Sequence, residues 1–505
     1  MSTSILSAVD WWARTAADRP ALVVLDDTLT YRELRDWSSR GADLLTARGV
    51  RPGDRVGLLG GNSLAWAVAA HAVLRAGAVL VPLNARLVGA ELHKVLTDAG
   101  ATHVIADAGF DDALAGIAEL GAMVDVTSLA DITALRSGGH HHVRVDRGEH
   151  DAVAVLFTSG STGLSKGVVC TERTLLDIVF EASLREEGLR PGCRTLLVLP
   201  LAFTPGLVWG LVMTAVLGGT LVVEPTLDPA RAVRLIEQHG IQVLFGVPLI
   251  YQALASAPEF ATADLSSIAM AAVGGAAVPV PLLTAWAGKG VQLRQIYGMT
   301  EIGGIATATL PVEADEHPGS CGVGSVFTEF RVVRTDGTDC EPGEPGEILL
   351  RGPGMTPGYW NDPVTTAQAF QDGWLHSGDL GQLDADGRLT FLDRLKDLII
   401  TGGINVSPVE IEAVIAAVPG VVEVAVIPAK DDRFGETPAA VVTAPATVTA
   451  DAVVAACAAV MADYKVPRYV VVRDEPLPRL PSGKISKREI RAEYDDIADR
   501  FLRVR

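Results

Sequence analysis

Short apolar runs alternate with longer amphipathic stretches through residues 28–106. The short runs have the length of buried strands, and the longer stretches repeat their apolar residues at helical spacing. Strands that alternate with helices in this way indicate βαβ units and a mostly parallel sheet. The same alternation resumes at about residue 152 and continues to about residue 300. The clearest predicted strands are 56–59, 78–82 and 103–105, and the clearest predicted helices are 31–48, 64–74 and 89–98.

The pattern changes at about residue 320, where short strands are separated by turns rich in proline, glycine and aspartate. Such spacing predicts a small antiparallel unit. After Asp393 strands and helices alternate on a smaller scale, which predicts a separate α+β domain of about 110 residues. We therefore expect an α/β protein with two domains. Residues 1–393 would form a large N-terminal domain of several subdomains, with parallel-rich sheets and the antiparallel unit, and residues 394–505 a small, mobile C-terminal domain.

The composition is that of a globular protein with a large core, since 49% of the 505 residues are hydrophobic and 20% are charged. A net charge of −19 argues against nucleic acid and anionic membranes as partners, because both require a basic face. The five cysteines are scattered and form no Cys-x-x-Cys pair, which indicates a reducing compartment and no structural zinc. We expect no metal site at the histidines 140–142, which fall in a predicted loop.

Residues 195–223 test whether the chain spans a membrane, because all 29 of them are uncharged. Prolines at 200 and 205 and glycines at 206, 218 and 219 interrupt the stretch. It therefore predicts a strand, a turn, a helix over 207–217, a glycine turn and a second strand. The first 20 residues lack the basic start and apolar core of a signal peptide. We expect a soluble, cytoplasmic protein without a membrane span.

The segment Phe157–Gly167 (FTSGSTGLSKG) combines glycines, hydroxyls and a lysine after the apolar run 152–156. Residues 168–187 follow with roughly helical spacing of apolar residues. Such a turn suits phosphate, because glycines admit the backbone, amides and hydroxyls donate hydrogen bonds and lysine supplies charge. It is not a Walker loop, which needs Gly-Lys-Ser/Thr at its end. The alternative is a flexible Ser/Gly linker, which the buried strand and the apolar-faced helix on either side disfavour.

Two further polar segments follow predicted strands, and these are Gly274–Ala277 and Tyr297–Glu301. Ligands in open parallel sheets bind beyond the carboxyl ends of the strands. Both segments are therefore candidates for a ligand site.

Taken in order, the motifs of this chain resemble the AMP-forming acyl-CoA synthetase family, within the adenylate-forming superfamily that also holds luciferases and peptide-synthetase adenylation domains. The resemblance covers about residues 28–487. The motifs that carry it are Phe157–Gly167, Tyr297–Glu301, Gly346–Gly352 with Gly358–Trp360, Trp374–Asp379, Asp393–Asp397, Gly403–Val406 with Pro408 and Glu412, and Pro481–Lys484.

The resemblance implies a role for each matching residue around ATP. Thr300 would bind the α-phosphate, and Glu301 would ligate Mg²⁺. Asp379, with Arg394, would bind the ribose hydroxyls. Lys484 would bridge the substrate carboxylate and the α-phosphate in the first step only. The residues implied to hold the β- and γ-phosphates are Thr158, Ser159, Ser161, Thr162 and Lys166, and those implied to line the adenine slot are Gly275, Ala276 and Tyr297.

The resemblance also implies that the small domain rotates about a hinge at Asp393 between the two half-reactions. The second orientation would bring Thr401–Gly403 to the site, where Gly403 leaves room for the pantetheine arm of coenzyme A. A plain tight turn is the alternative for these glycines.

The chain departs from the family where Ala202-Phe203 stands in place of the Phe-His of many relatives. Phe203 can gate a channel by rotation of its ring, but it cannot form a hydrogen bond through its side chain. Amino-acid-activating relatives carry an Asp near this position that pairs with the substrate ammonium, and this chain has none near Phe203. Arg294 is the one residue kept as an alternative cation for a second carboxylate of the substrate. The residues expected to line an apolar acyl pocket, each of which could equally be plain core, include Phe203, Trp209, Val247, Gly274 and Met299.

The resemblance implies an ATP-dependent carboxylic acid–CoA ligase that forms an acyl-AMP intermediate and releases AMP and pyrophosphate. We expect ATP, Mg²⁺ and coenzyme A as cofactors, and a hydrophobic acid that is aliphatic, alicyclic or aromatic as substrate. The alternatives are an enzyme of one half-reaction, with a carrier protein as acceptor or with thioester formation only, a luciferase-like oxygenase, and a non-catalytic nucleotide-binding protein. Whether the protein is a homodimer is left open.

Overall fold

The structure is a computed structural model, and it describes residues 3–119, 124–139, 144–158, 166–276, 278–314, 316–402, 404–480, 484–501 and 503–504. The chain forms two compact units. Unit 1 contains Met1–Phe330 and Leu350–His376, and unit 2 contains Arg331–Leu349 and Ser377–Arg505. The expectation that a mobile C-terminal domain begins after Asp393 stays a prediction.

Unit 1 is built on two largely parallel sheets, as the alternation of strands and helices predicts. The larger sheet is parallel except for its two edge strands, β14 and β2. Its order is β14 (Thr307–Ala308), β13 (Leu293–Tyr297), β12 (Met270–Gly274), β11 (Val243–Gly246), β9 (Arg194–Leu197), β10 (Thr220–Val223), β1 (Pro20–Val24) and β2 (Asp27–Thr30).

The smaller sheet of unit 1 is parallel except for the edge strand β8. Its order is β6 (Asp125–Ser128), β5 (His103–Ala106), β3 (Arg55–Leu59), β4 (Val79–Leu83), β7 (Ala152–Thr158) and β8 (Lys166–Thr171).

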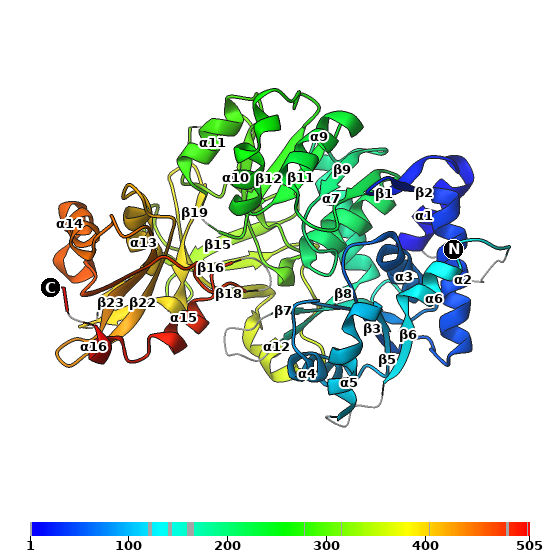
Figure 1. The fold of residues 1–505 in the computed structure, drawn as a ribbon, viewed down its shortest axis with the longest axis horizontal. Coiled ribbons are helices and arrows are strands. Elements are labelled where there is room, and N and C mark those ends of the chain that lie inside the picture. Colours follow the sequence, from blue (N-terminus) through cyan, green and yellow to red (C-terminus); the bar gives the residue numbers. More distant parts are fainter. Residues whose placement is uncertain are drawn as a thin grey trace. The chain divides into compact units, whose positions relative to one another are not determined.

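Three layers of helices enclose the two sheets of unit 1 (Figure 1). Neighbouring strand residues point to opposite faces, so Leu22 packs into the central layer between the sheets and Val23 into the outer one. The central helices are α1 (Ile5–Thr15), α2 (Tyr31–Ala47), α3 (Leu64–Arg75), α6 (Leu129–Ala134), α7 (Glu172–Arg185) and α8 (Met213–Val216). The outer helices are α9 (Pro229–His239), α10 (Pro248–Ser256) and α11 (Val280–Ala287) on the larger sheet, and α4 (Gly89–Ala99) and α5 (Asp111–Glu119) on the smaller.

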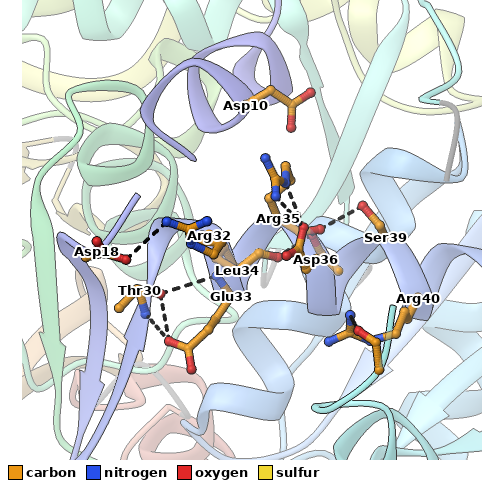
Figure 2. A network of polar contacts seen from close by, with 12 residues as sticks. Asp10, Asp18, Thr30, Arg32, Glu33, Leu34, Arg35, Asp36, Ser39 and Arg40 are labelled. Atoms are coloured by element: carbon orange, nitrogen blue, oxygen red, sulfur yellow. Dashed lines mark hydrogen bonds and ion pairs between the residues drawn. The ribbon is translucent and has the colours of Figure 1, made fainter. Parts of the chain in front are cut away.

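Helix α2 begins with a capping box formed by Thr30 and Glu33. The Thr30 hydroxyl accepts a hydrogen bond from the Glu33 amide at 3.3 Å, and the Thr30 amide donates to the Glu33 carboxylate at 2.8 Å (Figure 2). Arg32 in the same turn pairs with Asp18 at 3.3 Å. These contacts fix where the chain turns from β2 into the helix.

The segment after the glycine- and hydroxyl-rich turn differs from the prediction. A helical pattern is expected from residue 168, but Lys166–Thr171 forms β8, which pairs antiparallel with β7, and α7 begins only at Glu172. The β-branched Val168 and Val169 favour a strand, and Val168 also bridges to Tyr359. The described residues on either side of 159–165 are therefore two antiparallel strands, and a strand rather than a helix begins at Lys166.

Residues 195–223 fold as the interrupted pattern predicts. After β9, a helix of π type covers Pro205–Val212 and continues into α8, and β10 follows a glycine turn. Gly206 is required here, because a Cβ atom at this position would lie 2.1 Å from the Pro200 carbonyl oxygen. Within the described part of the chain, none of the helices has the length and apolar character needed to cross a bilayer.

The predicted antiparallel strands are present around the division between the units. The strands β15 (Glu329–Val333), β16 (Gly346–Arg351) and β18 (Trp374–Leu383) each have residues in both units. In unit 1, α12 (Pro363–Ala369) precedes β17 (Phe370–Gln371), which pairs antiparallel with the start of β18. In unit 2, the rest of β18 pairs antiparallel with β19 (Leu389–Arg394).

The remainder of unit 2 is an α+β fold with helices on both faces of one sheet (Figure 1). The sheet has the order β21 (Ile404–Val406), β20 (Ile399–Thr401), β23 (Gly435–Thr443) and β22 (Glu423–Asp431), and β24 (Tyr469–Arg473) also pairs with β23. Helices α13 (Pro408–Ala416) and α14 (Ala450–Val460) cover one face, and α15 (Lys487–Glu493) and α16 (Ile497–Arg500) cover the other. Its predicted elements after residue 393 are confirmed.

His71 gives unit 1 a predictable sensitivity to acid. It is buried in α3 among apolar side chains, and burial, assisted by the charge of Arg75, lowers its pKa from 6.5 to about 4. The unfolded chain therefore binds a proton at a higher pH than the folded chain. We expect the free energy of unfolding to fall by up to about 3 kcal/mol as the pH drops from about 6.5 to about 4.

Urea unfolding of the wild type and of His71→Leu at several pH values would measure this contribution. The variant should lose that part of the pH dependence, whereas His150→Gln should not, because the His150 side chain is 80% exposed. Identical pH profiles for the wild type and His71→Leu would contradict the assignment.

Candidate active site

Four predicted ligand-site residues meet at one edge of the larger sheet in unit 1. The strands β9, β11, β12 and β13 are adjacent and parallel, so their carboxyl ends lie along the same edge. Phe203 follows β9, Val247 follows β11, Gly274 ends β12 and Tyr297 ends β13. The fold thus assembles residues that are nearly 100 positions apart in sequence at the place where parallel sheets bind ligands.

The turn after β12 has a backbone that only glycine accommodates. A Cβ atom on Gly274 would lie 2.4 Å from the Ile296 side chain, and Gly275 has φ of +80°. Gly275 and Ala276 are exposed, whereas Tyr297 on the neighbouring strand is buried. An exposed turn beside a buried aromatic ring suits the predicted adenine slot.

Glu301, Tyr359 and Lys166 form a polar cluster within unit 1. The Tyr359 hydroxyl donates a hydrogen bond to Glu301 Oε1 at 2.9 Å, and Lys166 Nζ lies 4.9 Å from the centre of the Tyr359 ring. Burial and the neighbouring Glu301 carboxylate raise the pKa of Tyr359, so its hydroxyl remains a donor. Tyr359 therefore contacts both Glu301 and Lys166, which are two of the predicted catalytic residues.

Tyr359 belongs to one of the predicted motifs but has no predicted role. The signal was present in Gly358-Tyr359-Trp360, but its meaning depends on tertiary pairing. The Trp360 amide donates to the Gly167 carbonyl at 2.7 Å, and Val168 bridges to Tyr359. These contacts dock the motif on β8 and carry the ring to Lys166.

Thr300 also has a partner that the sequence did not predict. Its hydroxyl lies 2.8 Å from the hydroxyl of Thr204, which immediately precedes the π-type helix. In the same region the Trp209 indole donates to the Gly303 carbonyl at 2.8 Å. The predicted α-phosphate residue is thus in contact with the segment that carries Phe203.

The predicted acyl-pocket residues differ in their surroundings. Trp209 is buried and belongs to the central core, with its ring centre 5.5 Å from that of Phe245. Phe203, Val247 and Met299 are half-buried near the carboxyl edge. Trp209 therefore serves as core and leaves the other three as the better candidates for contact with a ligand.

Arg294, the candidate cation for a second substrate carboxylate, forms contacts with other residues of the protein. Its guanidinium forms a buried ion pair with Glu186 and donates to the Thr309 carbonyl at 2.7 Å. Both side chains are almost fully buried. Arg294 therefore ties β13 to the residues after α7 and is not available to a second substrate carboxylate.

Several predicted phosphate and coenzyme residues lie outside the described residues. These are Ser159, Ser161, Thr162 and Gly403. Thr158 and Lys166 flank the first group and belong to paired positions of β7 and β8. The predicted roles of the four residues stay predictions.

Asp379, Arg394 and Lys484 come together within unit 2. Asp379 on β18 faces Arg394 on β19, and Arg394 Nε lies 3.6 Å from Asp379 Oδ1. Burial and the Arg394 charge lower the pKa of Lys484, while the Asp379 carboxylate acts in the opposite direction. The predicted ribose pair and the predicted catalytic lysine therefore share one electrostatic environment.

Asp393, the predicted hinge, is held by its side chain. Its carboxylate accepts hydrogen bonds from the Ser407 hydroxyl at 2.7 Å and from the Val409 amide at 3.2 Å, and it is buried. Ser407 in turn caps α13. Asp393 thus joins the end of β19 to the first helix that follows it.

The donor set of unit 1 fits magnesium in combination with a phosphate ligand. Among the residues that the structure describes, no group of three or more His, Cys, Asp or Glu side chains is arranged to hold a metal ion. Mg²⁺ is commonly held by one or two carboxylates together with waters and substrate phosphates. The buried Glu301 supplies such a carboxylate, so a metal here would arrive with the nucleotide.

Fold and site together define an adenylate-forming enzyme, and comparison with known proteins agrees. Residues 9–360 match the family described as AMP-binding enzyme, and residues 410–484 match the AMP-binding enzyme C-terminal domain. Feruloyl-CoA synthase of an Amycolatopsis species is 37% identical over 473 residues, covering 92% of this chain and 94% of that protein. Long-chain-fatty-acid–CoA ligase FadD13 of Mycobacterium tuberculosis is 37% identical, covering 93% and 94%.

A solved structure of similar fold is o-succinylbenzoate CoA synthetase of Bacillus subtilis in complex with its acyl-adenylate intermediate. It is 30% identical, covers 96% of this chain and 97% of its own, and superposes with a TM-score of 0.87. The chain belongs to the AMP-binding enzyme family and, within it, to the acyl-CoA synthetases. It is an acid–thiol ligase that uses ATP, Mg²⁺ and coenzyme A and proceeds through an acyl-AMP.

Proposed function

We propose that this ligase activates a hydrophobic monocarboxylic acid, with the carboxyl edge of the larger sheet as its acyl site. The observation that carries the proposal is the half-buried, apolar character of Phe203, Val247 and Met299 at that edge. Residues 199–213 contain no charged side chain, and Arg294 is bound to Glu186. A second carboxylate or an ammonium on the substrate would therefore find no counter-charge in residues 199–213 and no free cation at Arg294, and a buried unpaired charge is costly.

The two chemical steps place different demands on the residues. In the first, a carboxylate oxygen attacks the α-phosphorus of ATP, and the bond to the pyrophosphate oxygen breaks. In the second, the thiol of coenzyme A gives up its proton to the solvent, its sulfur attacks the acyl carbonyl, and AMP leaves with the bonding electrons. The first step gathers negative charge, so positioning and electrostatic stabilisation dominate it.

The residues of unit 1 would serve the phosphates and the metal. Lys166 would bind the leaving pyrophosphate together with Thr158, and Thr300 would bind the α-phosphate. Glu301 would ligate Mg²⁺, which screens the phosphate charges when bound. The hydrogen bond from Tyr359 supports this role, because it fixes the orientation of the Glu301 carboxylate. Gly275, Ala276 and Tyr297 would receive the adenine.

The residues of unit 2 would serve the ribose and the reacting carboxylate. Asp379 would accept hydrogen bonds from the ribose hydroxyls, and Arg394 would hold Asp379 in place. Lys484 would place its ammonium on the substrate carboxylate and the α-phosphate. Asp393 would act as the hinge, since it stands near the end of β19, just before the rest of the α+β fold.

Similar proteins support an apolar acid as the substrate class. Their printed names include feruloyl-CoA synthase, long-chain-fatty-acid–CoA ligase and indoleacetate–CoA ligase. These acids share one carboxylate on an otherwise largely apolar body, although they differ in shape and length. We therefore propose the class and leave the individual acid to experiment.

Incubation with ATP, Mg²⁺ and a panel of acids tests the proposal. We expect pyrophosphate release and acyl-CoA with a hydrophobic monoacid, and at least tenfold lower kcat/KM with a dicarboxylic acid or amino acid of matched size, because a buried unpaired charge is costly. Preference for the dicarboxylic acid would overturn the substrate class. AMP formation with transfer only to a phosphopantetheinyl carrier protein, and not to coenzyme A, would favour the alternative acceptor.

We further propose that the enzyme works in the cytoplasm. Cys170, Cys193, Cys340 and Cys457 are free thiols, and three of these four are buried, which suits a reducing compartment. Cell fractionation would test the location. A homodimer also stays a prediction, which light scattering of the purified protein would test.

A further inference from the structure

Two acidic residues of the family motifs have no role in the chemistry described above. Asp397 closes the motif Asp393–Asp397, and Glu412 follows Pro408 in α13. Both lie in unit 2 and both are largely buried, with 19% and 18% of their side chains exposed. Buried carboxylates are costly unless paired, so their partners indicate what they are for.

Both acids pair with the same short helix, α15. Glu412 Oε1 lies 2.8 Å from Lys487 Nζ, and Asp397 Oδ1 lies 3.2 Å from the Arg491 guanidinium. Lys487 and Arg491 are four residues apart, so they lie on one face of α15. We call these two ion pairs the α15 clamp.

The Glu412–Lys487 pair joins helices on opposite faces of the sheet (Figure 1). Helix α13 packs on one face and α15 on the other, and between them lies β22, an edge strand. Glu412 Oε1 also accepts a hydrogen bond from the Val426 amide of β22 at 2.7 Å. The Glu412 carboxylate of α13 therefore contacts both α15 and the edge strand β22.

Helix α15 begins three residues after Lys484. The Leu480 amide donates to the Lys484 carbonyl at 2.7 Å, and the Ser486 amide donates to the Pro478 carbonyl at 2.7 Å. Ser486 caps α15, and Ile490 anchors it in the core. Because only Ile485 and Ser486 separate Lys484 from the first residue of α15, a shift of the helix moves the lysine.

The second ion pair of the clamp, Asp397–Arg491, involves the segment that carries Arg394. Asp397 is three residues beyond Arg394, which pairs with Asp379 and acts on the Lys484 ammonium. The Asp397–Arg491 pair therefore connects α15 to the segment that carries Arg394. The clamp fixes α15, the helix that follows Lys484, relative to both α13 and the predicted ribose pair.

We propose that Glu412 and Asp397 are positioning residues for Lys484, acting through α15. The inference rests on the proposed role of Lys484 in acyl-AMP formation. Loss of either pair would let the Lys484 ammonium drift from its working position, and a displacement of about 1 Å can cost up to about 100-fold in rate. The second half-reaction does not use Lys484, so it should be insensitive to the clamp.

The test uses Glu412→Gln and Asp397→Asn in the full chain, with each half-reaction measured separately. We expect kcat for ATP-dependent acyl-AMP formation to fall about tenfold or more, and the conversion of supplied acyl-AMP and coenzyme A to acyl-CoA to stay within about twofold. Glu410→Gln is the matched control, because Glu410 lies on the same helix but pairs with Lys465 at 2.7 Å. It should leave both half-reactions unchanged.

A second pair of variants covers the case in which Glu412→Gln does not fold. Lys487→Gln and Arg491→Gln break the same contacts from α15, and they should show the same selective loss. Equal loss in both half-reactions, or no loss in either, would overturn the proposal in any variant that unfolds at the wild-type temperature.

The Lys484→Ala background separates failure of the clamp from failure of the proposed function. In that background Glu412→Gln should cause no further loss of acyl-AMP formation, because the two substitutions act on one element. A wild type that releases no pyrophosphate with any acid would refute the proposed function. An unimpaired Lys484→Ala would refute the role of the lysine, and an additive effect of Glu412→Gln would refute only the clamp.

Discussion

Replacement of Lys484 with alanine is expected to reduce acyl-AMP formation by about 10³-fold while leaving thioester formation from supplied acyl-AMP nearly intact. The physical reason is that the first step brings a carboxylate to an already anionic phosphate. A preorganised cation aimed at charge that develops in the transition state contributes about two to three orders of magnitude in rate. Lys484 lies in a desolvated environment, where such a contribution is larger than in water.

Pyrophosphate release measures the first step, and acyl-CoA formation from a synthetic acyl-AMP measures the second. Lys430→Ala is the control, because Lys430 is an exposed lysine on β22 of the same unit. It should leave both steps unchanged. Full ATP-dependent activity in Lys484→Ala would show that the assignment is wrong.

Replacement of Glu301 with glutamine is expected to reduce kcat/KM for acyl-AMP formation by about 100-fold and to raise the Mg²⁺ concentration needed for half-maximal rate. The amide keeps the shape of the side chain, so the hydrogen bond from the Tyr359 hydroxyl can persist on its oxygen. What is lost is the negative charge that a hard cation requires. The variant therefore tests metal binding with little change in packing.

Tyr359→Phe completes this experiment. It keeps the ring beside Lys166 and removes only the hydroxyl that orients Glu301. We expect a smaller loss, about tenfold, with the Mg²⁺ requirement shifted in the same direction, because one hydrogen bond to a charged group is removed. An unaltered Mg²⁺ dependence in Glu301→Gln would remove the metal role from this residue.

Much of the fold was predictable because its signals are local. The alternation of strands and helices identified the parallel sheets, and the glycines and prolines within 195–223 distinguished a strand–helix–strand segment from a membrane span. The error at Val168–Thr171 is instructive. Its apolar spacing suits a helix or an edge strand equally, and pairing with β7 and docking of Tyr359 decided for the strand.

The candidate site was predictable only as a set of motifs. The predicted roles of Thr300, Glu301, Asp379 and Lys484 come from the resemblance of their motifs to the family, and their residue types suit phosphate, Mg²⁺ and ribose as ligands. Which side chains support them did not follow. Thr204 is 96 residues from Thr300, and Tyr359 is 58 residues from Glu301.

The sequence by itself determined the reaction class of this protein, since the order of its motifs specifies an acyl-CoA synthetase and its uncharged segment after β9 favours an apolar acid. Only the tertiary structure decided the contacts of the predicted site residues: Glu301 with Tyr359, Asp379 with Arg394, and Asp393 with Ser407. It also supplied the ion pairs of Glu412 and Asp397 with α15, through which we propose that Lys484 is positioned. The physical reason is that a side chain's chemistry is carried by its own atoms, whereas its position depends on burial and on partners that only the folded chain brings within a hydrogen bond's length.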